Sequence, residues 1–292
     1  MADIETIGVV GAGLMGNGIA HVAAQAGYRV ILHDAYPDAL KRAQETIAKN
    51  MGREVKRERL SADDRDAALS RIQAADDVSA VGEAELVIEA VTENLDLKLK
   101  LYEQIVPALK SGAIFASNTS SISITRLGAA APDPARFIGV HFFNPVPVMK
   151  LVELIRGMAT SDETYETLKN VVTQFGKIPI DAKDSPGFIV NRILCPMLNE
   201  AAFAVLEGLG TVESIDAGMK LGAAHPMGPL ALSDYVGLDT LLAVMQVLHR
   251  DLGEDKYRPC PLLVKLVEAG WLGVKSGRGF YDYSQQPPTP TL

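Results

Sequence analysis

A histidine and a glutamate on either side of a proline-containing turn are the residues of this sequence best suited to proton transfer. The apolar run at residues 137–140 predicts a short strand ending on His141, and a second strand-like run at residues 150–154 contains Glu153. Asn144 and the nearby prolines predict the turn between them, so His141 and Glu153 are expected at facing strand ends. An imidazole can take a proton from an alcohol near physiological pH, and a carboxylate behind it fixes the tautomer and stabilises the imidazolium. The pair therefore has the chemistry of a base for hydride transfer.

The same two residues also fit a purely structural role. His141 would then be a core histidine with satisfied hydrogen bonds, and Glu153 a surface charge at the edge of a strand, because structural ion pairs also bring such groups together. The functional interpretation depends on whether other polar side chains gather at neighbouring strand ends.

A glycine-rich segment follows the first predicted strand. Residues 4–10 form an apolar strand pattern, GAGLMG follows at residues 11–16, and residues 17–26 predict a helix that ends at Gly27. The first glycine of this segment permits a tight turn, the second lets the backbone approach a pyrophosphate, and the third permits close packing of helix on strand. The free N–H groups at the helix N-terminus favour the same anion. The predicted dinucleotide contacts are Gly11, Gly13, Leu14, Met15 and Gly16.

An acidic residue follows the second predicted strand. The apolar residues 30–32 lead to Asp34, which stands at about the spacing from Gly16 expected of a carboxylate that binds a ribose hydroxyl. Because a carboxylate there repels a 2′-phosphate, the sequence predicts NAD rather than NADP as the cofactor.

Two charged residues follow the apolar strand predicted at residues 86–91. Ligands of an open α/β sheet bind outside the carboxyl ends of its strands, so Glu93 and Lys98 are candidate cofactor contacts. Lys98 fits a solvated helix lysine equally well.

A polar run follows the next predicted strand, residues 113–116. One serine of this run is expected to cap the following helix, while Asn118 and Ser120 are candidate ligand contacts. Helices and strands alternate up to His141, which predicts a Rossmann-type doubly wound, mainly parallel sheet. Further along, residues 161–175 predict a helix and residues 178–180 a short edge strand.

A basic segment stands out in this acidic protein. It follows a helix predicted from residue 37 to about residue 50 and contains Lys49, Arg53, Lys56, Arg57 and Arg59. Such a segment could bind the phosphates of a nucleotide tail, but charged helix faces exposed to solvent are equally common. Residues 63–75 predict another exposed helical segment.

The pattern changes after the turn cluster at residues 183–187, beyond which apolar helical segments no longer alternate with strands. We therefore expect an NAD-binding domain at residues 1–184, an all-helical domain at residues 185–284, and a loose tail rich in Pro and Thr at residues 285–292. Asn191, a polar residue within an apolar helix, is expected to need a hydrogen-bonding partner.

Bulk composition excludes several classes of protein. The net charge of −8 argues against general nucleic-acid binding. No secretory signal is visible, and charged or polar residues interrupt every apolar stretch before it could cross a bilayer, so no membrane association is expected. The two cysteines, Cys195 and Cys260, have no metal-ligand spacing and are expected to be reduced, which fits the cytoplasm and a protein without a bound metal.

Six motifs together resemble the L-3-hydroxyacyl-CoA dehydrogenase family, in particular its short monofunctional type. They are IGVVGAGLMGNGIA, ASNTSS, GVHFFNPVPVMKLVE, DSPGFIVNR, HPMGPLALSDYVGLD and GVKSGRGFYDY, which span nearly the whole chain. The glycine fingerprint is shared with many dehydrogenases, whereas HFFNP with the downstream glutamate and PGFIVNR are far more selective. The resemblance implies reversible, NAD-dependent oxidation of an L-3-hydroxyacyl-CoA, with 3-hydroxybutyryl-CoA as the expected substrate, to the 3-ketoacyl-CoA.

The resemblance also implies roles for individual residues. It makes His141 the catalytic base and Glu153 the residue that orients it, and it places Ser120 and Asn191 near the reacting oxygen of the substrate. The contacts that it implies for the nicotinamide half or the phosphates of the cofactor are Glu93, Lys98, Asn144 and Lys275. The CoA tail is expected over Asn50, Lys56 and Arg57. The family further implies a homodimer formed through the helical domain, which would also contribute to the substrate cleft.

Three other functions also fit the sequence. A relative acting on a free hydroxy acid or sugar acid would use the same base without a CoA site. An NAD-binding protein that has lost catalysis would have no need of His141, Glu153, Ser120 and Asn191. In a lysine-based dehydrogenase, Lys150 or Lys183 would be the acid or base instead.

Overall fold

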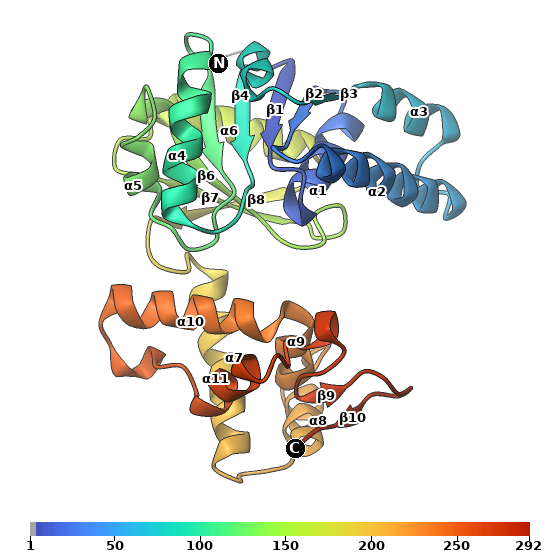
Figure 1. The fold of residues 1–292 in the computed structure, drawn as a ribbon, viewed down its shortest axis with the longest axis vertical. Helices are drawn as coiled ribbons and strands as arrows, with labels where there is room; N and C mark the ends of the chain where they lie inside the picture. Colours follow the sequence, from blue (N-terminus) through green and yellow to red (C-terminus); the bar gives the residue numbers. More distant parts are fainter. Residues whose placement is uncertain (1–3) are drawn as a thin grey trace. The chain divides into compact units, whose positions relative to one another are not determined.

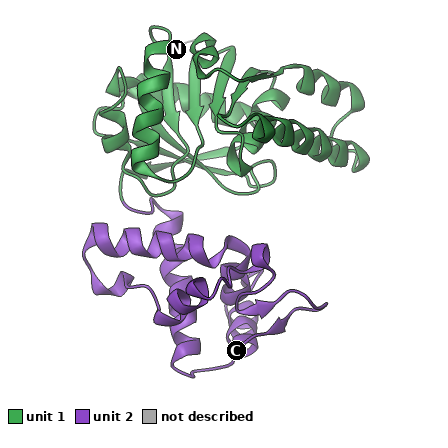
Figure 2. Cartoon of the chain, viewed as in Figure 1, with its two compact units in different colours: residues 1–185 green, residues 186–292 purple. Residues whose placement is uncertain are grey.

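The computed structural model describes residues 4–292, which form two compact units. The first unit ends at Ser185 and the second is Pro186–Leu292, and Figure 2 colours them separately.

The first unit is built on an eight-stranded sheet with the order β3-β2-β1-β4-β5-β6-β7-β8 (Figure 1). The strands are β1 Thr6–Val10, β2 Arg29–His33, β3 Ile72–Ala75, β4 Leu86–Glu89, β5 Ile114–Ser117, β6 Phe137–Phe142, β7 Leu151–Arg156 and β8 Ile178–Lys183. Every neighbouring pair is parallel except β6 and β7, which are antiparallel. The predicted doubly wound, mainly parallel sheet is confirmed.

Helices cover both faces of this sheet. They are α1 Leu14–Gln25, α2 Pro37–Lys56, α3 Ala62–Ser70, α4 Leu95–Ile105, α5 Ile124–Gly128 and α6 Asp162–Gln174, with 3₁₀ turns at Val78–Glu83, Val106–Ala108 and Pro134–Arg136. Side chains of α1, α2 and α6 join one apolar cluster with alternate residues of the strands. On the other face, Tyr102 of α4 packs against Phe115 and Phe137.

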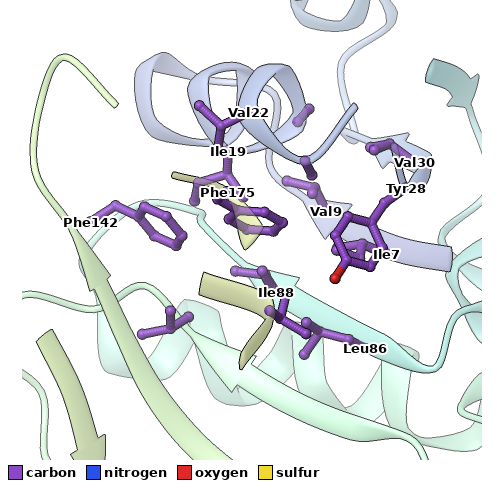
Figure 3. Close-up of a cluster of buried hydrophobic side chains, with 14 of the residues drawn as sticks. Ile7, Val9, Ile19, Val22, Tyr28, Val30, Leu86, Ile88, Phe142 and Phe175 are labelled. Atoms are coloured by element: carbon purple, nitrogen blue, oxygen red, sulfur yellow. The ribbon is translucent and has the colours of Figure 1, made fainter. Parts of the chain in front are cut away.

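The core explains why these segments form a parallel sheet. Ile7 and Val9 of β1 and Ile88 of β4 are fully buried and face Ile19 of α1 (Figure 3). Since successive side chains of a strand point to opposite faces, strands buried on both sides require nearly continuous apolar sequence. The segments predicted as strands from such runs are the central strands of this sheet.

Two expectations for the first unit are corrected. Helix α2 extends to Lys56, so most of the basic segment lies on the helix and not beyond it. The segment 63–75, expected to be helical throughout, contains α3 and then strand β3, which pairs only with β2 at the edge of the sheet. Gln73 and Ala74 of this strand are exposed, and an edge strand with a solvated face lacks the apolar run that would have indicated it.

The second unit is mainly helical, as predicted. Its helices are α7 Val190–Leu206, α8 Val212–Gly222, α9 Pro229–Val236, α10 Leu238–Leu252 and α11 Pro261–Glu268, with 3₁₀ turns at Asp255–Tyr257 and Val274–Ser276. Apolar residues of these helices form a separate core. No single helix of residues 4–292 is both long and apolar enough to cross a bilayer, although α9 and α10, bent by 96° at their junction, would pass that test if counted together.

The C-terminal segment corrects two further expectations. Strand β9, Tyr281–Asp282, pairs with β10, Thr289–Pro290, so the second unit is not wholly helical. The hydroxyl of Thr291 donates to the backbone oxygens of Gly279 and Phe280, which attaches part of the expected loose tail to the domain. Strands of two residues are too short to show a periodic apolar pattern, and the sequence therefore did not indicate them.

A buried amide of α7 binds the backbone of the segment that leads into α11. Asn199 of α7 is 3% exposed; its side chain donates to the Arg258 carbonyl at 3.0 Å and accepts from the Cys260 N–H at 2.8 Å. Asn191, the amide of this helix expected to need a partner, is only partly buried, whereas Asn199 is buried.

We predict that Asn199→Ala destabilises the protein, because it leaves the part-buried Arg258 carbonyl and the buried Cys260 N–H without this partner. The free energy of unfolding, measured by urea denaturation, should fall by about 3 kcal/mol. Glu200→Ala, at the exposed neighbouring position, should change it by less than about 0.5 kcal/mol. Equal effects of the two substitutions would contradict the role given to Asn199.

Candidate active site

His141 and Glu153 form a buried pair at the one antiparallel junction of the described sheet. The register of β6 and β7 places them directly opposite each other, and His141 Nδ1 lies 2.7 Å from Glu153 Oε2. Glu153 is fully buried and His141 is 6% exposed, which excludes the surface-charge interpretation of Glu153. The ring of Phe143 lies 4.5 Å from the imidazole ring and packs against it. The carboxylate therefore fixes the orientation of the imidazole from one side.

The glycine segment forms a turn that tolerates no side chains at two positions. Gly11 has φ +102°, and a Cβ there would lie 2.7 Å from the Ala90 carbonyl oxygen. A Cβ on Gly16 would lie 1.6 Å from the carbonyl oxygen of Gly11, so the first turn of α1 packs directly on the loop. Gly13 precedes α1, and a Cβ there would meet no atom within 4 Å. This open backbone at a helix N-terminus is what a pyrophosphate needs.

Asp34 lies beside this turn. Its Oδ2 accepts the Ala12 N–H at 2.7 Å, and its Oδ1 accepts the Tyr36 N–H at 3.0 Å. The carboxylate is thus fixed at the carboxyl end of β2, next to the strand that leads into the glycine turn. This is the position that a ribose-binding acid requires.

Glu93 organises the polar loop that follows β5. Its Oε1 accepts the backbone N–H groups of Ser120 and Ser121 at 2.8 and 2.9 Å and the Thr119 hydroxyl at 2.7 Å. Burial opposes ionisation of Glu93, but Lys98 and these hydrogen bonds outweigh it and keep the pKa of Glu93 below its usual value. Ser120 also donates its hydroxyl to Glu93 at 3.1 Å. Glu93 and Ser120, both predicted as site residues, are therefore in contact.

A buried acid that the sequence analysis missed anchors this group. Lys98 Nζ lies 2.6 Å from Glu89 Oε1 and 3.6 Å from Glu93 Oε2, and the lysine is only 1% exposed. Glu89 Oε2 accepts the hydroxyls of Ser117 and Tyr102 at 2.7 and 3.1 Å. The interpretation of Lys98 as a solvated lysine is wrong. The signal for Glu89 was present in the sequence, since a lone acid within an apolar strand must find partners.

Asn118 links the ends of two strands. Its side-chain oxygen accepts the N–H of Phe142, the residue after His141, at 3.0 Å. Asn144 is exposed in the turn that follows β6. The structure thus gathers polar groups at the carboxyl ends of successive parallel strands, with the histidine at the end of the last of them.

The predicted CoA-tail residues lie near the end of α2. Arg53 donates to the Asn50 side chain at 3.4 Å, and Lys56 and Arg57 are exposed at the last residue and C-cap of the helix. Cations at a helix C-terminus also interact favourably with the helix dipole. Lys56 and Arg57 therefore also fit a purely structural role.

Asn191 and Lys275 belong to the second unit. Asn191 lies in the first turn of α7, and exposed Lys275 pairs with Asp239, its Nζ 2.5 Å from Oδ1. Their contacts with substrate and cofactor stay predictions.

Comparisons with known proteins cover almost the whole chain. The family description "3-hydroxyacyl-CoA dehydrogenase, NAD binding domain" matches residues 6–185, and "3-hydroxyacyl-CoA dehydrogenase, C-terminal domain" matches residues 187–283. A 3-hydroxybutyryl-CoA dehydrogenase of Bradyrhizobium diazoefficiens is 56% identical over 99% of both chains. A probable 3-hydroxybutyryl-CoA dehydrogenase of Deinococcus radiodurans is 51% identical over 94% of this chain and 99% of the relative. The crystal structure of (S)-3-hydroxybutyryl-CoA dehydrogenase from Ralstonia eutropha superimposes with a TM-score of 0.93 at 52% identity, covering 97% of this chain and 100% of the other.

We predict that Glu89→Gln destabilises the first unit, because it leaves the buried Lys98 ammonium without its nearest negative charge. Removing one partner of a buried ion pair should lower the free energy of unfolding by about 3 kcal/mol, measured by urea denaturation. The matched control is Glu83→Gln, which removes the exposed partner of Arg29 and should cost under about 1 kcal/mol. A loss as small as that of the control would show that Lys98 does not depend on Glu89.

Proposed function

Because the chain belongs to the 3-hydroxyacyl-CoA dehydrogenase family, we propose that it oxidises an L-3-hydroxyacyl-CoA reversibly to the 3-ketoacyl-CoA through the His141–Glu153 pair. It is an NAD-dependent oxidoreductase that acts on a CH–OH group. The names of its relatives support 3-hydroxybutyryl-CoA as the substrate. The single observation that carries the proposal is the 2.7 Å contact between two buried groups, an imidazole and a carboxylate, on facing strands.

In the proposed oxidation His141 takes the proton of the substrate hydroxyl. Since Glu153 engages Nδ1, Nε2 is the nitrogen that would exchange this proton. Glu153 keeps the ring in one orientation and stabilises the imidazolium that forms. NAD, when bound, supplies the acceptor for the hydride that leaves C3. In the reverse direction the imidazolium returns its proton to the oxygen of the 3-ketoacyl group.

The residues around the glycine turn fit the cofactor. Gly13 leaves the backbone open to a pyrophosphate, and Asp34 offers a carboxylate to a ribose. Leu14 and Met15 would line the phosphates at the start of α1, and the predicted contacts nearer the nicotinamide are Glu93, Lys98, Asn118, Ser120 and Asn144. Of these, Lys98 would act mainly through Glu93, because its ammonium is buried between two glutamates.

The substrate contacts are proposals of the same kind. Ser120 and Asn191 would hydrogen-bond the substrate near its reacting oxygen, and Lys275 would contact the cofactor. Asn50, Lys56 and Arg57 would meet the phosphates of the CoA tail, which the exposure of both cations supports.

We also propose that the protein forms a homodimer through the helical unit. Three large apolar side chains of that unit are highly exposed, Ile193 by 68%, Leu209 by 82% and Leu221 by 86%, and burial against a second copy would remove them from water. Both cysteines are free and buried, which supports a reducing compartment such as the cytoplasm.

Two rival activities are separated by simple assays. An enzyme for a free hydroxy acid would reduce free acetoacetate as well as acetoacetyl-CoA, whereas the proposed enzyme should require the thioester. A lysine-based dehydrogenase would use Lys150 or Lys183, but both are exposed, whereas His141 is buried against its carboxylate.

We predict that His141→Gln lowers kcat for acetoacetyl-CoA reduction by about 10³-fold, within the usual range for loss of a general acid–base group. The affinity for NADH, measured by fluorescence titration, should stay close to normal because the glycine turn and Asp34 are untouched. His249→Gln, at a partly exposed histidine of α10 that lies outside the first unit, should have normal turnover. Undiminished turnover of His141→Gln would refute the proposed base.

We predict that Asp34→Asn erodes the preference for NAD. The amide oxygen can still accept the Ala12 N–H, so the change in the ratio of kcat/KM for NADH and NADPH reports the lost charge. Asp38→Asn, an exposed acid in the first turn of α2, should leave the ratio unchanged. An unaltered ratio in Asp34→Asn would show that this carboxylate does not face the ribose.

A further inference from the structure

A buried lysine lies outside all the contacts described so far. Lys177, between α6 and β8, is 7% exposed, and no carboxylate among residues 4–292 lies within 4 Å of its ammonium group. Burial lowers the pKa of Lys177, and the more distant charge of Glu54 offsets this only in part. A buried cation without a charged partner must obtain its stabilisation from well-placed dipoles.

Those dipoles belong to the turn between the two proposed catalytic strands. Lys177 Nζ donates to the backbone oxygens of Val146 and Met149, at 2.5 and 2.9 Å. The next residue, Ile178, donates its backbone N–H to the Lys150 oxygen at 2.7 Å. Three carbonyl groups of the segment that connects His141 to Glu153 are therefore bound by two consecutive residues.

The same turn also rests on the helix that follows the glycine turn. A Cβ on Gly18 of α1 would lie 2.7 Å from Cβ of Val146, a contact closer than side chains normally allow. Val146 is itself 2% exposed. The turn is thus enclosed between α1 on one side and the Lys177 ammonium on the other.

We infer that Lys177 is a positioning residue that holds the β6–β7 turn against α1 and thereby fixes the His141–Glu153 pair relative to the cofactor site. The inference rests on the proposed function, since it gives Lys177 a role only if His141 exchanges the proton. Its physical basis is geometric. Hydride transfer requires near-contact between the reacting atoms, and a misplacement of about 1 Å can lower the rate by about 100-fold. The turn also contains Asn144, a predicted cofactor contact, which would shift with it.

The test compares Lys177→Met with Lys177→Arg in the full-length enzyme. Met fills a similar volume without donors, so kcat with NADH and acetoacetyl-CoA should fall at least about tenfold, whereas KM for NADH should change less than about threefold. Arg retains donors and should keep more of the activity. The primary isotope effect on kcat with 4-deuterated NADH should rise in Lys177→Met, because the hydride step becomes more nearly rate-limiting. Lys169→Met, at an exposed lysine of α6, is the matched control and should match the wild type.

A purely structural lysine would behave differently. In that case kcat would fall only in proportion to the folded fraction, measured by circular dichroism, and the isotope effect would not change; this outcome overturns the inference. If Lys177→Met does not fold, Gly18→Ala decides on the same readouts, because its added methyl group pushes Val146 without removing the lysine. If folded Lys177→Met has a normal kcat while His141→Gln is inactive, the role of Lys177 is rejected and the proposed base is not. Active His141→Gln rejects the proposed base.

Discussion

A hydrogen-bonded contact between two buried ionisable groups, His141 and Glu153, depends on a reversal of chain direction inside a parallel sheet. Only an antiparallel pair joined by a short turn can place residues so close in sequence directly opposite each other, since a parallel connection needs a crossover of a dozen or more residues. Register matters equally, because a slip of one residue would move one side chain of the pair to the other face. The turn from 143 to 150 therefore determines the geometry of the proposed base as much as the two residues do.

The remaining polar groups of the first unit follow from the same sheet. Parallel strands end at a common edge, so Asp34, Glu93, Asn118 and His141 come together although they are distant in sequence. The carboxylates among them are stabilised by backbone N–H groups and hydroxyls. The network extends inward to Glu89, whose charge the buried ammonium of Lys98 balances. A buried ion pair between Lys98 and Glu89 thus supports this edge of the sheet.

Sequence alone predicted the elements with strong periodicity and the residues with distinctive chemistry. The glycine turn and the strand that ends near His141 both produce local patterns. Strand β3 and the β9–β10 pair were missed because edge and two-residue strands have little apolar signal. Glu89, Lys177 and Asn199 were missed for another reason: their partners lie on other elements, and only tertiary packing shows that their side chains are buried. Sequence patterns thus identify residue types and local elements, but they do not show which distant residues will be packed together.

The close approach of Gly16 to the Gly11 carbonyl bears on how this chain could change during evolution or redesign. With 1.6 Å available where a methyl group would stand, neither position accepts variation without rebuilding the loop. We therefore do not expect substitutions at Gly11 or Gly16 to change the nucleotide selectivity. The surface segment just past β2 has more room for substitution, because the Tyr36 side chain is 73% exposed.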